Sequence, residues 1–161
     1  MQIRSKVIVL GSSGFVGKNI FNKLKEKDYE VLSTTRSKID NQELIYFDIE
    51  DEISWKTIKE IAPEIIIDAT GYGVVKTQTS VDKMYDINYR KKKEFCRYLK
   101  PQLPNVFWIQ IGTAFEYDLS CSRITEDSLC FPDTHYGISK LMFSNYLLQE
   151  KVAYAPIIET M

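Results

Sequence analysis

The sequence predicts an α/β fold, in which a doubly wound parallel sheet carries helices on both faces. Three observations predict it. Short apolar runs alternate with helical patterns along the whole chain, these runs have no polar face, and a glycine-rich turn follows the first of them. A chain of 161 residues has the length of one domain, so we expect residues 1–161 to form a single unit.

Six strands are expected where short β-branched runs end at glycine, proline or polar residues. Residues 6–10 form a continuous apolar run that ends at Gly11, and residues 64–68 contain three consecutive isoleucines after Pro63. The expected strands are residues 6–10, 30–35, 44–47, 64–68, 106–111 and 154–158.

Helices are expected between these strands, where apolar residues recur at helical spacing or a proline ends the pattern. The expected helices are residues 14–27, 53–61, 80–100 and 137–151. Residues 114–132 have no clear periodicity, and because long loops in compact domains often have a function, we expect this segment to line a site.

Charge and cysteine content exclude several classes of protein. The net charge is −1, so there is no basic field to attract nucleic acid or an anionic membrane. The apolar run at residues 7–10 is too short for an export signal, and no window approaches the ~20 apolar residues of a membrane span. Cys96, Cys121 and Cys130 form no CxxC pair, which indicates neither a disulfide framework nor a metal site. A cytoplasmic location is therefore expected.

The turn after the first strand is typical of dinucleotide binding. In Gly11-Ser12-Ser13-Gly14-Phe15-Val16-Gly17, the first glycine permits a tight turn, the second lets backbone amides approach a pyrophosphate, and the third lets the helix lie close to the strand. A Walker A motif is excluded, because five residues separate Gly11 from Gly17 and Asn19 follows Lys18. The turn and the alternating pattern together predict a Rossmann-type sheet.

The end of the second strand bears on the choice of cofactor. NAD-binding proteins of this kind carry an acidic residue there, whereas this strand ends Thr34-Thr35-Arg36-Ser37. The guanidinium of Arg36 can pair with a 2′-phosphate, so NADP is expected ahead of NAD. The alternative is an ordinary solvated arginine.

A second constellation consists of Tyr136, Lys140 and Thr113. The tyrosine and the lysine lie four residues apart at the start of a helix, so they share a face, and the ammonium favours the phenolate form of the tyrosine. Thr113 follows the fifth strand at the edge where parallel sheets bind ligands. The alternatives are a tyrosine beside a surface lysine and a hydroxyl that caps the strand end.

With these motifs, the chain resembles the extended short-chain dehydrogenase/reductase family from Val7 to about Gln149. That family comprises NAD(P)-dependent nucleotide-sugar epimerases, dehydratases and reductases. The matching motifs are the three glycines of the turn, Asp48-Ile49 after the third strand, Ala69-Thr70-Gly71 after the fourth, Asn88 in the long helix, and the approach from Thr125 through Pro132 to Tyr136-Gly137-Ile138-Ser139-Lys140.

The resemblance implies roles for these residues. Tyr136 would be the general acid/base, Lys140 would bind the nicotinamide ribose, Thr113 would orient the substrate oxygen and Asn88 would support proton transfer. The residues expected at the cofactor are Gly11, Ser13, Gly14, Phe15, Val16, Gly17, Arg36, Asp48, Ile49, Ala69, Thr70, Gly71, Tyr136 and Lys140.

The implied activity is an NADP-dependent oxidoreductase acting on a nucleotide-activated sugar, as an epimerase, a dehydratase or a keto-sugar reductase. The family continues into a C-terminal substrate lobe, whereas this sequence stops at Met161, so we expect that lobe to be missing. The alternative function is a non-catalytic dinucleotide-binding module with a regulatory or structural role.

Two further expectations concern surfaces. The helices at residues 80–100 and 137–151 are apolar on more than one stripe, and the resemblance also makes them the dimer bundle, so a homodimer through these helices is expected. The run Arg90-Lys91-Lys92-Lys93 is read as a solvated helix face, and His135 as a surface residue.

Overall fold

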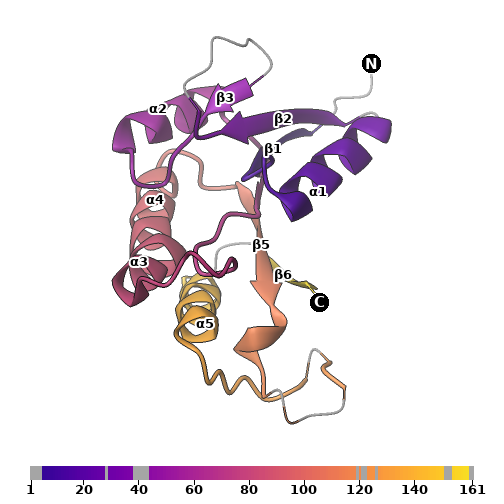
Figure 1. Ribbon diagram of the computed structural model, residues 1–161. Coiled ribbons are helices and arrows are strands. Elements are labelled where there is room, and N and C mark those ends of the chain that lie inside the picture. Colours follow the sequence, from indigo (N-terminus) through magenta and orange to yellow (C-terminus); the bar gives the residue numbers. More distant parts are fainter. Residues whose placement is uncertain are drawn as a thin grey trace.

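The computed structural model describes residues 5–27, 29–37, 44–118, 120, 123–125 and 127–150, together with the backbone of residues 154–159. Its sheet has six parallel strands in the order β3-β2-β1-β4-β5-β6 (Figure 1), which confirms the predicted doubly wound sheet. The strands are β1 Lys6–Leu10, β2 Glu30–Thr35, β3 Leu44–Tyr46, β4 Ile65–Asp68, β5 Phe107–Thr113 and β6 Tyr154–Glu159.

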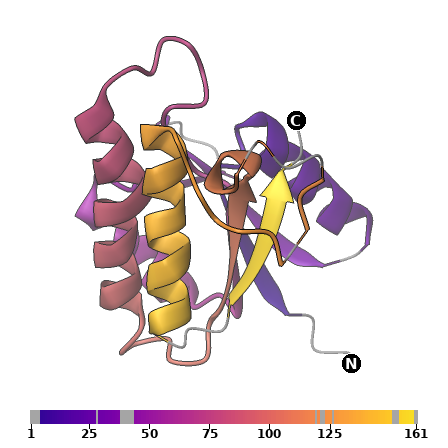
Figure 2. The same ribbon diagram turned by 90° about the horizontal axis from the view of Figure 1, so that it is seen from below.

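Helices cover both faces of this sheet. Helix α1 lies on one face, whereas α4 and α5 lie side by side on the other, where α2 also packs (Figure 2). Among the described residues, no helix combines the length and the apolar character needed to cross a membrane. The helical segments are α1 Phe15–Glu26, α2 Glu52–Ile61, α3 Val81–Tyr85, the π-helical turn η1 Asp86–Arg90, α4 Lys91–Leu99, the 3₁₀ turn η2 Ala114–Glu116 and α5 His135–Gln149.

The larger of the two hydrophobic cores lies under α2, α4 and α5. Its centre is a chain of aromatic rings. The centroid of the Phe95 ring lies 5.4 Å from that of Trp55 and 5.8 Å from that of Trp108, and the centroids of Trp108 and Phe143 lie 5.9 Å apart. The smaller core packs the opposite sides of β1, β4 and β5 against α1. Strands buried on both faces explain the absence of a polar face in the sequence.

The long helix expected over residues 80–100 is interrupted in its middle. The structure divides it into α3, the π turn η1 and α4, and the turn contains Asn88. The hydrogen bonds of a π turn span one more residue than those of an α-helix, which rotates the residues after the turn relative to those before it. The amide of Asn88 is buried and makes three hydrogen bonds, and these accompany the widened turn.

The prediction of a solvated basic run was wrong for one of its members. Lys92 is completely buried and forms an ion pair with Asp68 at the end of β4. Arg90 is exposed, and Lys91 is partly exposed and pairs with Glu94. The reason is helical geometry, because the side of α4 that carries Lys92 also carries the core residue Phe95.

Candidate functional site at the carboxyl edge of the sheet

A cleft lies at the carboxyl edge of the sheet, around the point where the strand order reverses between β1 and β4. Ligands of doubly wound sheets bind at this position. The loops after β1, β2, β3 and β4 all contribute to it. Its lining consists of Gly11, Ser13, Gly14, Thr34, Thr35, Arg36, Phe47, Asp48, Ile49, Glu50, Ala69, Thr70, Gly71, Tyr72 and Ile87.

The glycine turn approaches its neighbours too closely for side chains. Gly11 has φ of +79°, and a Cβ there would lie 3.1 Å from Ala69 and from the Thr70 methyl group. A Cβ on Gly17 would collide with the carbonyl oxygen of Gly11, so α1 rests directly on the turn. Gly14 precedes the helix as its N-cap and lines the cleft. The turn therefore provides a backbone cradle at a helix N-terminus, which suits a phosphate group.

Three residues of this motif that were expected at the cofactor do not line the cleft. Phe15 is 83% exposed, and Val16 is half-buried against the core under α1. Phe15, Val16 and Gly17 were all expected at the cofactor; in the structure they form the first turn of α1, beside the cleft.

Serine and threonine side chains tie the turn to the end of β2. Ser12 Oγ donates to the carbonyl of Thr34 at 2.8 Å and accepts from its N–H at 2.7 Å, while the N–H of Gly11 donates to Thr34 Oγ1 at 3.1 Å. These bonds hold the strand end beside the glycines, so Arg36 reaches the same cleft. No role for Ser12 or Thr34 was predicted from the sequence, although hydroxyl residues directly after β1 and late in β2 could have indicated these hydrogen bonds.

The three proposed catalytic residues come from α5 and the end of β5. Lys140 is 4% exposed, and its Nζ donates to the carbonyl of Ile111 at 2.6 Å. Thr113, two residues further along β5, is 7% exposed. Tyr136 is half-buried, one turn before Lys140. The lysine thus lies beneath the strand end that carries the threonine.

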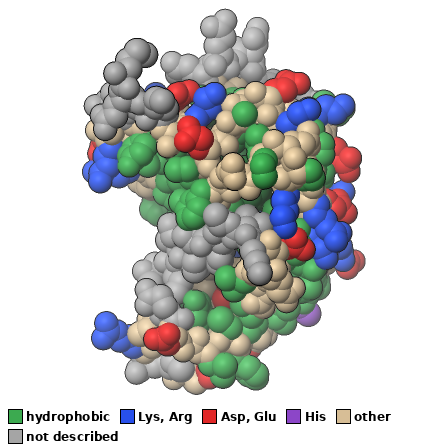
Figure 3. Space-filling view, turned by 180° about the vertical axis from the view of Figure 1, so that it is seen from behind, with side chains coloured by type: hydrophobic (Ala, Val, Ile, Leu, Met, Phe, Trp, Pro, Cys, Tyr) green, Lys and Arg blue, Asp and Glu red, His purple; other side chains and the backbone are tan. Residues whose placement is uncertain are grey.

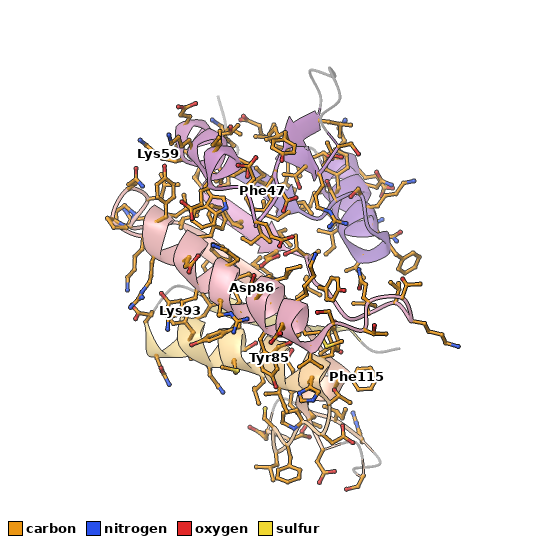
Figure 4. All side chains as sticks on the ribbon, turned by 60° about the vertical axis from the view of Figure 1, so that its left-hand side comes forward. Phe47, Lys59, Tyr85, Asp86, Lys93 and Phe115 are labelled. Carbon is orange, nitrogen blue, oxygen red and sulfur yellow. The ribbon has the colours of Figure 1, made fainter. Side chains whose placement is uncertain are left out.

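Tyr136 packs between two loops. Its ring meets the ring of Phe115 edge-on, with the centroids 6.2 Å apart, and Phe115 lies beside the N-terminal end of α5 (Figure 4). On the other side, a Cβ on Gly73 would lie 3.1 Å from Tyr136 Cδ2. Gly73 directly follows the wall of the cleft that ends at Tyr72, so the tyrosine ring lies next to that wall.

Thr113 and Glu116 form a capping box around η2. The N–H of Thr113 donates to Glu116 Oε1 at 2.9 Å, and Thr113 Oγ1 accepts from the N–H of Phe115. Glu116 is 6% exposed and also accepts from Ser144 Oγ at 3.1 Å. Burial raises the pKa of Glu116, and the positive charge of Lys140 opposes that rise. This carboxylate was not predicted from the sequence, although the spacing Thr-x-x-Glu at residues 113–116 is typical of a capping box.

Comparison with known proteins gives a family. The family model described as NAD dependent epimerase/dehydratase family matches residues 7–159. The chain belongs to this family. The recognition made from the sequence motifs is thereby confirmed, and the cleft and glycine turn occupy the part of the chain that the match covers.

Individual relatives of the family match only in part. A CDP-abequose synthase from Salmonella typhimurium is 31% identical over 77 residues, which are 48% of this chain and 25% of that protein. A dTDP-4-dehydrorhamnose reductase from Bacillus anthracis in complex with NADP has a TM-score of 0.76 at 20% identity, over 98% of this chain and 54% of that one. The Bordetella bronchiseptica enzyme WbmG in complex with NAD and UDP has a TM-score of 0.78 at 15% identity, over 96% of this chain and 52% of that one. The chain therefore spans about half the length of these two structures and shares their fold.

The residues present fit the dinucleotide after which the family is named. The backbone cradle at Gly11 and Gly14 suits a pyrophosphate, and the polar and apolar pair Asp48 and Ile49 lines the same cleft. In the described part of the chain, no group of three or more His, Cys, Asp or Glu side chains is arranged to hold a metal ion. Positively and negatively charged side chains are interspersed on the face seen in Figure 3.

Proposed function

We propose that this chain is the cofactor-binding and catalytic part of an NADP-dependent oxidoreductase that acts on a nucleotide-activated sugar. One observation carries the proposal. The wall of the cleft that follows β4 continues into Gly73, against which the ring of Tyr136 packs. A group that can transfer a proton therefore lies next to the cleft that suits a dinucleotide. The proposal covers three reactions of such a sugar: epimerisation, dehydration and reduction of a keto-sugar.

The chain's own residues would divide the work between binding and proton transfer. Backbone amides of the glycine turn would hold the phosphates, and Asp48 and Ile49 would contact the adenosine end. The bound nicotinamide would supply hydride chemistry. Tyr136 would give a proton to, or take one from, the sugar oxygen, and Lys140 would favour the ionised phenol by its positive charge.

Thr113 would orient the sugar oxygen. Its Oγ1 already accepts a hydrogen bond from the N–H of Phe115. The hydroxyl proton of Thr113 can be donated at the same time, and in this role it would be donated to the sugar oxygen. Lys140 reaches the carbonyl of Ile111 on the same strand, so threonine and lysine are held by one rigid element. Asn88 would support the relay from behind, through its bond to Ser139 on α5.

The preference for NADP rests on Arg36. This residue lines the cleft, and the described end of β2, through Ser37, has no acidic side chain. A guanidinium can pair with the 2′-phosphate that distinguishes NADP from NAD. Of the two solved structures described above, one contains NADP and the other NAD, so this preference needs a direct test.

The substrate class rests on the names of the relatives. The Salmonella relative is a CDP-abequose synthase, the Bacillus structure is a reductase of a dTDP-linked sugar, and the Bordetella structure contains UDP. All three names refer to a nucleotide or a sugar joined to one. We extend this class to the protein that contains the present chain.

We also propose a homodimer through α3, α4 and α5, in a cytoplasmic protein. Much of the apolar surface of these helices is used in the core, including Phe95 and Phe143. An interface is supported by the apolar side chains of these helices that stay exposed: Val81 is 40%, Met142 37% and Leu148 60% exposed. The proposed location rests on the sparse cysteine content, since disulfides are rare in the cytoplasm. Cys96 and Cys130 are free thiols, and Cys121 lies outside the described residues. Sedimentation of Met142→Glu against the unchanged chain tests the dimer.

A binding titration tests the proposed function. The purified chain is titrated with NADPH and with NADH by nicotinamide fluorescence, beside Arg36→Ala and a control, Arg97→Ala, on the outside of α4. We expect tighter binding of NADPH, loss of that preference in Arg36→Ala only, and unchanged binding in Arg97→Ala. Equal affinity for both cofactors in the unchanged chain would overturn the NADP assignment, and binding of neither would overturn the function.

A further inference from the structure

A buried ion pair lies directly behind the cleft. Asp68, the last residue of β4, is 1% exposed, and Lys92 of α4 is completely buried. Lys92 Nζ lies 2.8 Å from Asp68 Oδ2. Two charges removed from water in this way gain no clear net stability over apolar residues of similar volume. The pair therefore calls for an explanation other than stability of the core.

Both partners also bind the same neighbouring residue, Thr70. Asp68 Oδ1 accepts from the N–H of Thr70 at 2.9 Å and from its hydroxyl at 2.5 Å. Lys92 Nζ donates to the carbonyl oxygen of Thr70 at 2.8 Å. The N–H, the C=O and the side chain of one residue are thus all held by the ion pair.

Thr70 forms part of the cleft wall that lies against the glycine turn. It lines the cleft together with Ala69 and Gly71, and a Cβ on Gly11 would lie 3.1 Å from the Thr70 methyl group. A shift of the Thr70 peptide by a few tenths of an ångström would therefore change the width of the space beside the turn. An apolar pair in place of Asp68 and Lys92 could fill the same volume, but it could not hold this peptide.

Lys92 also lies close to helix α5. Its Nζ lies 5.7 Å from the centroid of the Phe143 ring on α5, the helix that carries Tyr136 and Lys140. The ammonium thus lies where β4, α4 and α5 meet. Its contacts within hydrogen-bonding distance are to Asp68 and Thr70, so its charge is directed toward the cleft wall.

We propose that Asp68 and Lys92 are positioning residues for the dinucleotide, which hold the Thr70 peptide at the width that the bound cofactor requires. Neither side chain touches the cofactor in this role. The inference rests on the proposed function for the identity of the ligand. The clamp itself, three hydrogen bonds from an ion pair to one residue, can be examined without any ligand.

The test separates stability from cofactor affinity. Three variants, Asp68→Val, Lys92→Met and the double variant, are compared with Lys91→Met, which removes a partly exposed lysine from the same helix. Each single change leaves one buried charge without its partner and lowers the unfolding midpoint. The double change removes both charges, so the midpoint recovers. We expect NADPH affinity of the double variant to stay about tenfold below that of the unchanged chain, the equivalent of one lost hydrogen bond.

Recovery of affinity together with stability in the double variant would overturn the proposal, because the pair would then serve core packing alone. An NADPH affinity that is unchanged in all three variants would also overturn the proposal. If the single variants do not fold, the double variant decides. Amide exchange at Thr70 in the absence of cofactor is the second measurement. If the unchanged chain binds no dinucleotide, the proposed function fails, whereas faster exchange at Thr70 in the double variant supports the clamp and unchanged exchange overturns it.

Discussion

The side-chain amide of Asn88 pairs with both backbone groups of Tyr72. The N–H of Tyr72 donates to Asn88 Oδ1, and Asn88 Nδ2 donates to the carbonyl of Tyr72, each at 2.8 Å. The same Nδ2 donates to Ser139 Oγ at 3.0 Å. A residue in the π turn therefore holds the end of the cleft wall and links it to α5, which carries the proposed catalytic tyrosine.

Replacing Asn88 should both destabilise the chain and weaken the site. In Asn88→Ala, the two backbone groups of Tyr72 lose their partner, and the hydroxyl of Ser139 loses its donor but still donates to the carbonyl of Tyr136. We expect the free energy of unfolding to fall by about 2 kcal/mol. Ser139→Ala is the control: it removes the bond from Asn88 and the bond from Ser139 Oγ to the carbonyl of Tyr136, and it leaves both bonds to Tyr72 in place. Urea unfolding of the two variants measures the difference. An Asn88→Ala variant no less stable than Ser139→Ala would show that the two bonds to Tyr72 contribute no more than the single bond from Ser139 to Tyr136.

The close approach of α1 to the glycine turn predicts a contrast between two glycines. A Cβ on Gly17 would collide with backbone atoms of Gly11 and Ser12, whereas a Cβ on Gly71 would lie 3.7 Å from its nearest neighbour, Asn88 Oδ1. Backbone cannot move aside as a side chain can, so we expect Gly17→Ala to lower the free energy of unfolding by about 2 kcal/mol. Gly71→Ala should change it by less than about 0.5 kcal/mol. Urea midpoints of the two variants decide this, and equal midpoints would contradict it.

Much of the fold could be predicted because its signals are local. Continuous apolar runs such as Lys6–Leu10 predict strands buried on both faces, and the glycine turn predicts where the first helix begins. The predicted ends of some helices and strands differ slightly from those in the structure. Helix α5 begins at His135, two residues before the expected start, because Thr134 caps it by accepting from the N–H of Gly137. A cap depends on a single side chain and is hard to recognise in advance.

What the sequence did not reveal are interactions between distant residues. The ion pair of Asp68 and Lys92 joins positions 24 residues apart in the chain, and in the sequence Lys92 is one of four consecutive basic residues. The π turn is likewise set by the contact of Asn88 with Tyr72 and Ser139. Because register and tertiary partners decide such contacts, they became visible only with the fold. The catalytic and cofactor roles of the individual residues stay predictions.

Glu116 should make the stability of the chain depend on pH. Burial raises the pKa of this carboxyl above its value in the unfolded chain. Between the unfolded and the folded pKa, the folded state binds more protons, so stability falls as the pH rises through that window. The glutamine of the Glu116→Gln variant cannot ionise, so the stability of that variant does not fall for this reason as the pH rises. We therefore expect the stability of Glu116→Gln relative to the unchanged chain to increase as the pH rises from about 4 to 7.

Glu150 provides a control of the opposite sign. A hydrogen bond and the charge of Lys100 lower the pKa of the Glu150 carboxyl, so its contribution is present above the unfolded pKa and is lost as the pH falls through the folded one. Glu150→Gln should therefore lose stability relative to the unchanged chain as the pH rises. Urea unfolding at several pH values gives both slopes. Two slopes of the same sign would contradict the assignment for Glu116.

Tyr136→Phe tests the proposed chemistry most directly. The change removes the hydroxyl that would transfer the proton and leaves the ring that packs against Phe115 and Gly73. We expect turnover of a nucleotide sugar to be abolished in the protein that contains this chain, while NADPH affinity changes less than about twofold, since a proton-transfer group acts mainly in the transition state. Tyr85→Phe is the control, because the Tyr85 hydroxyl bonds to His135 Nδ1 at 3.1 Å near the same helix start but has no assigned role. Unchanged turnover in Tyr136→Phe would rule out this tyrosine as the general acid/base.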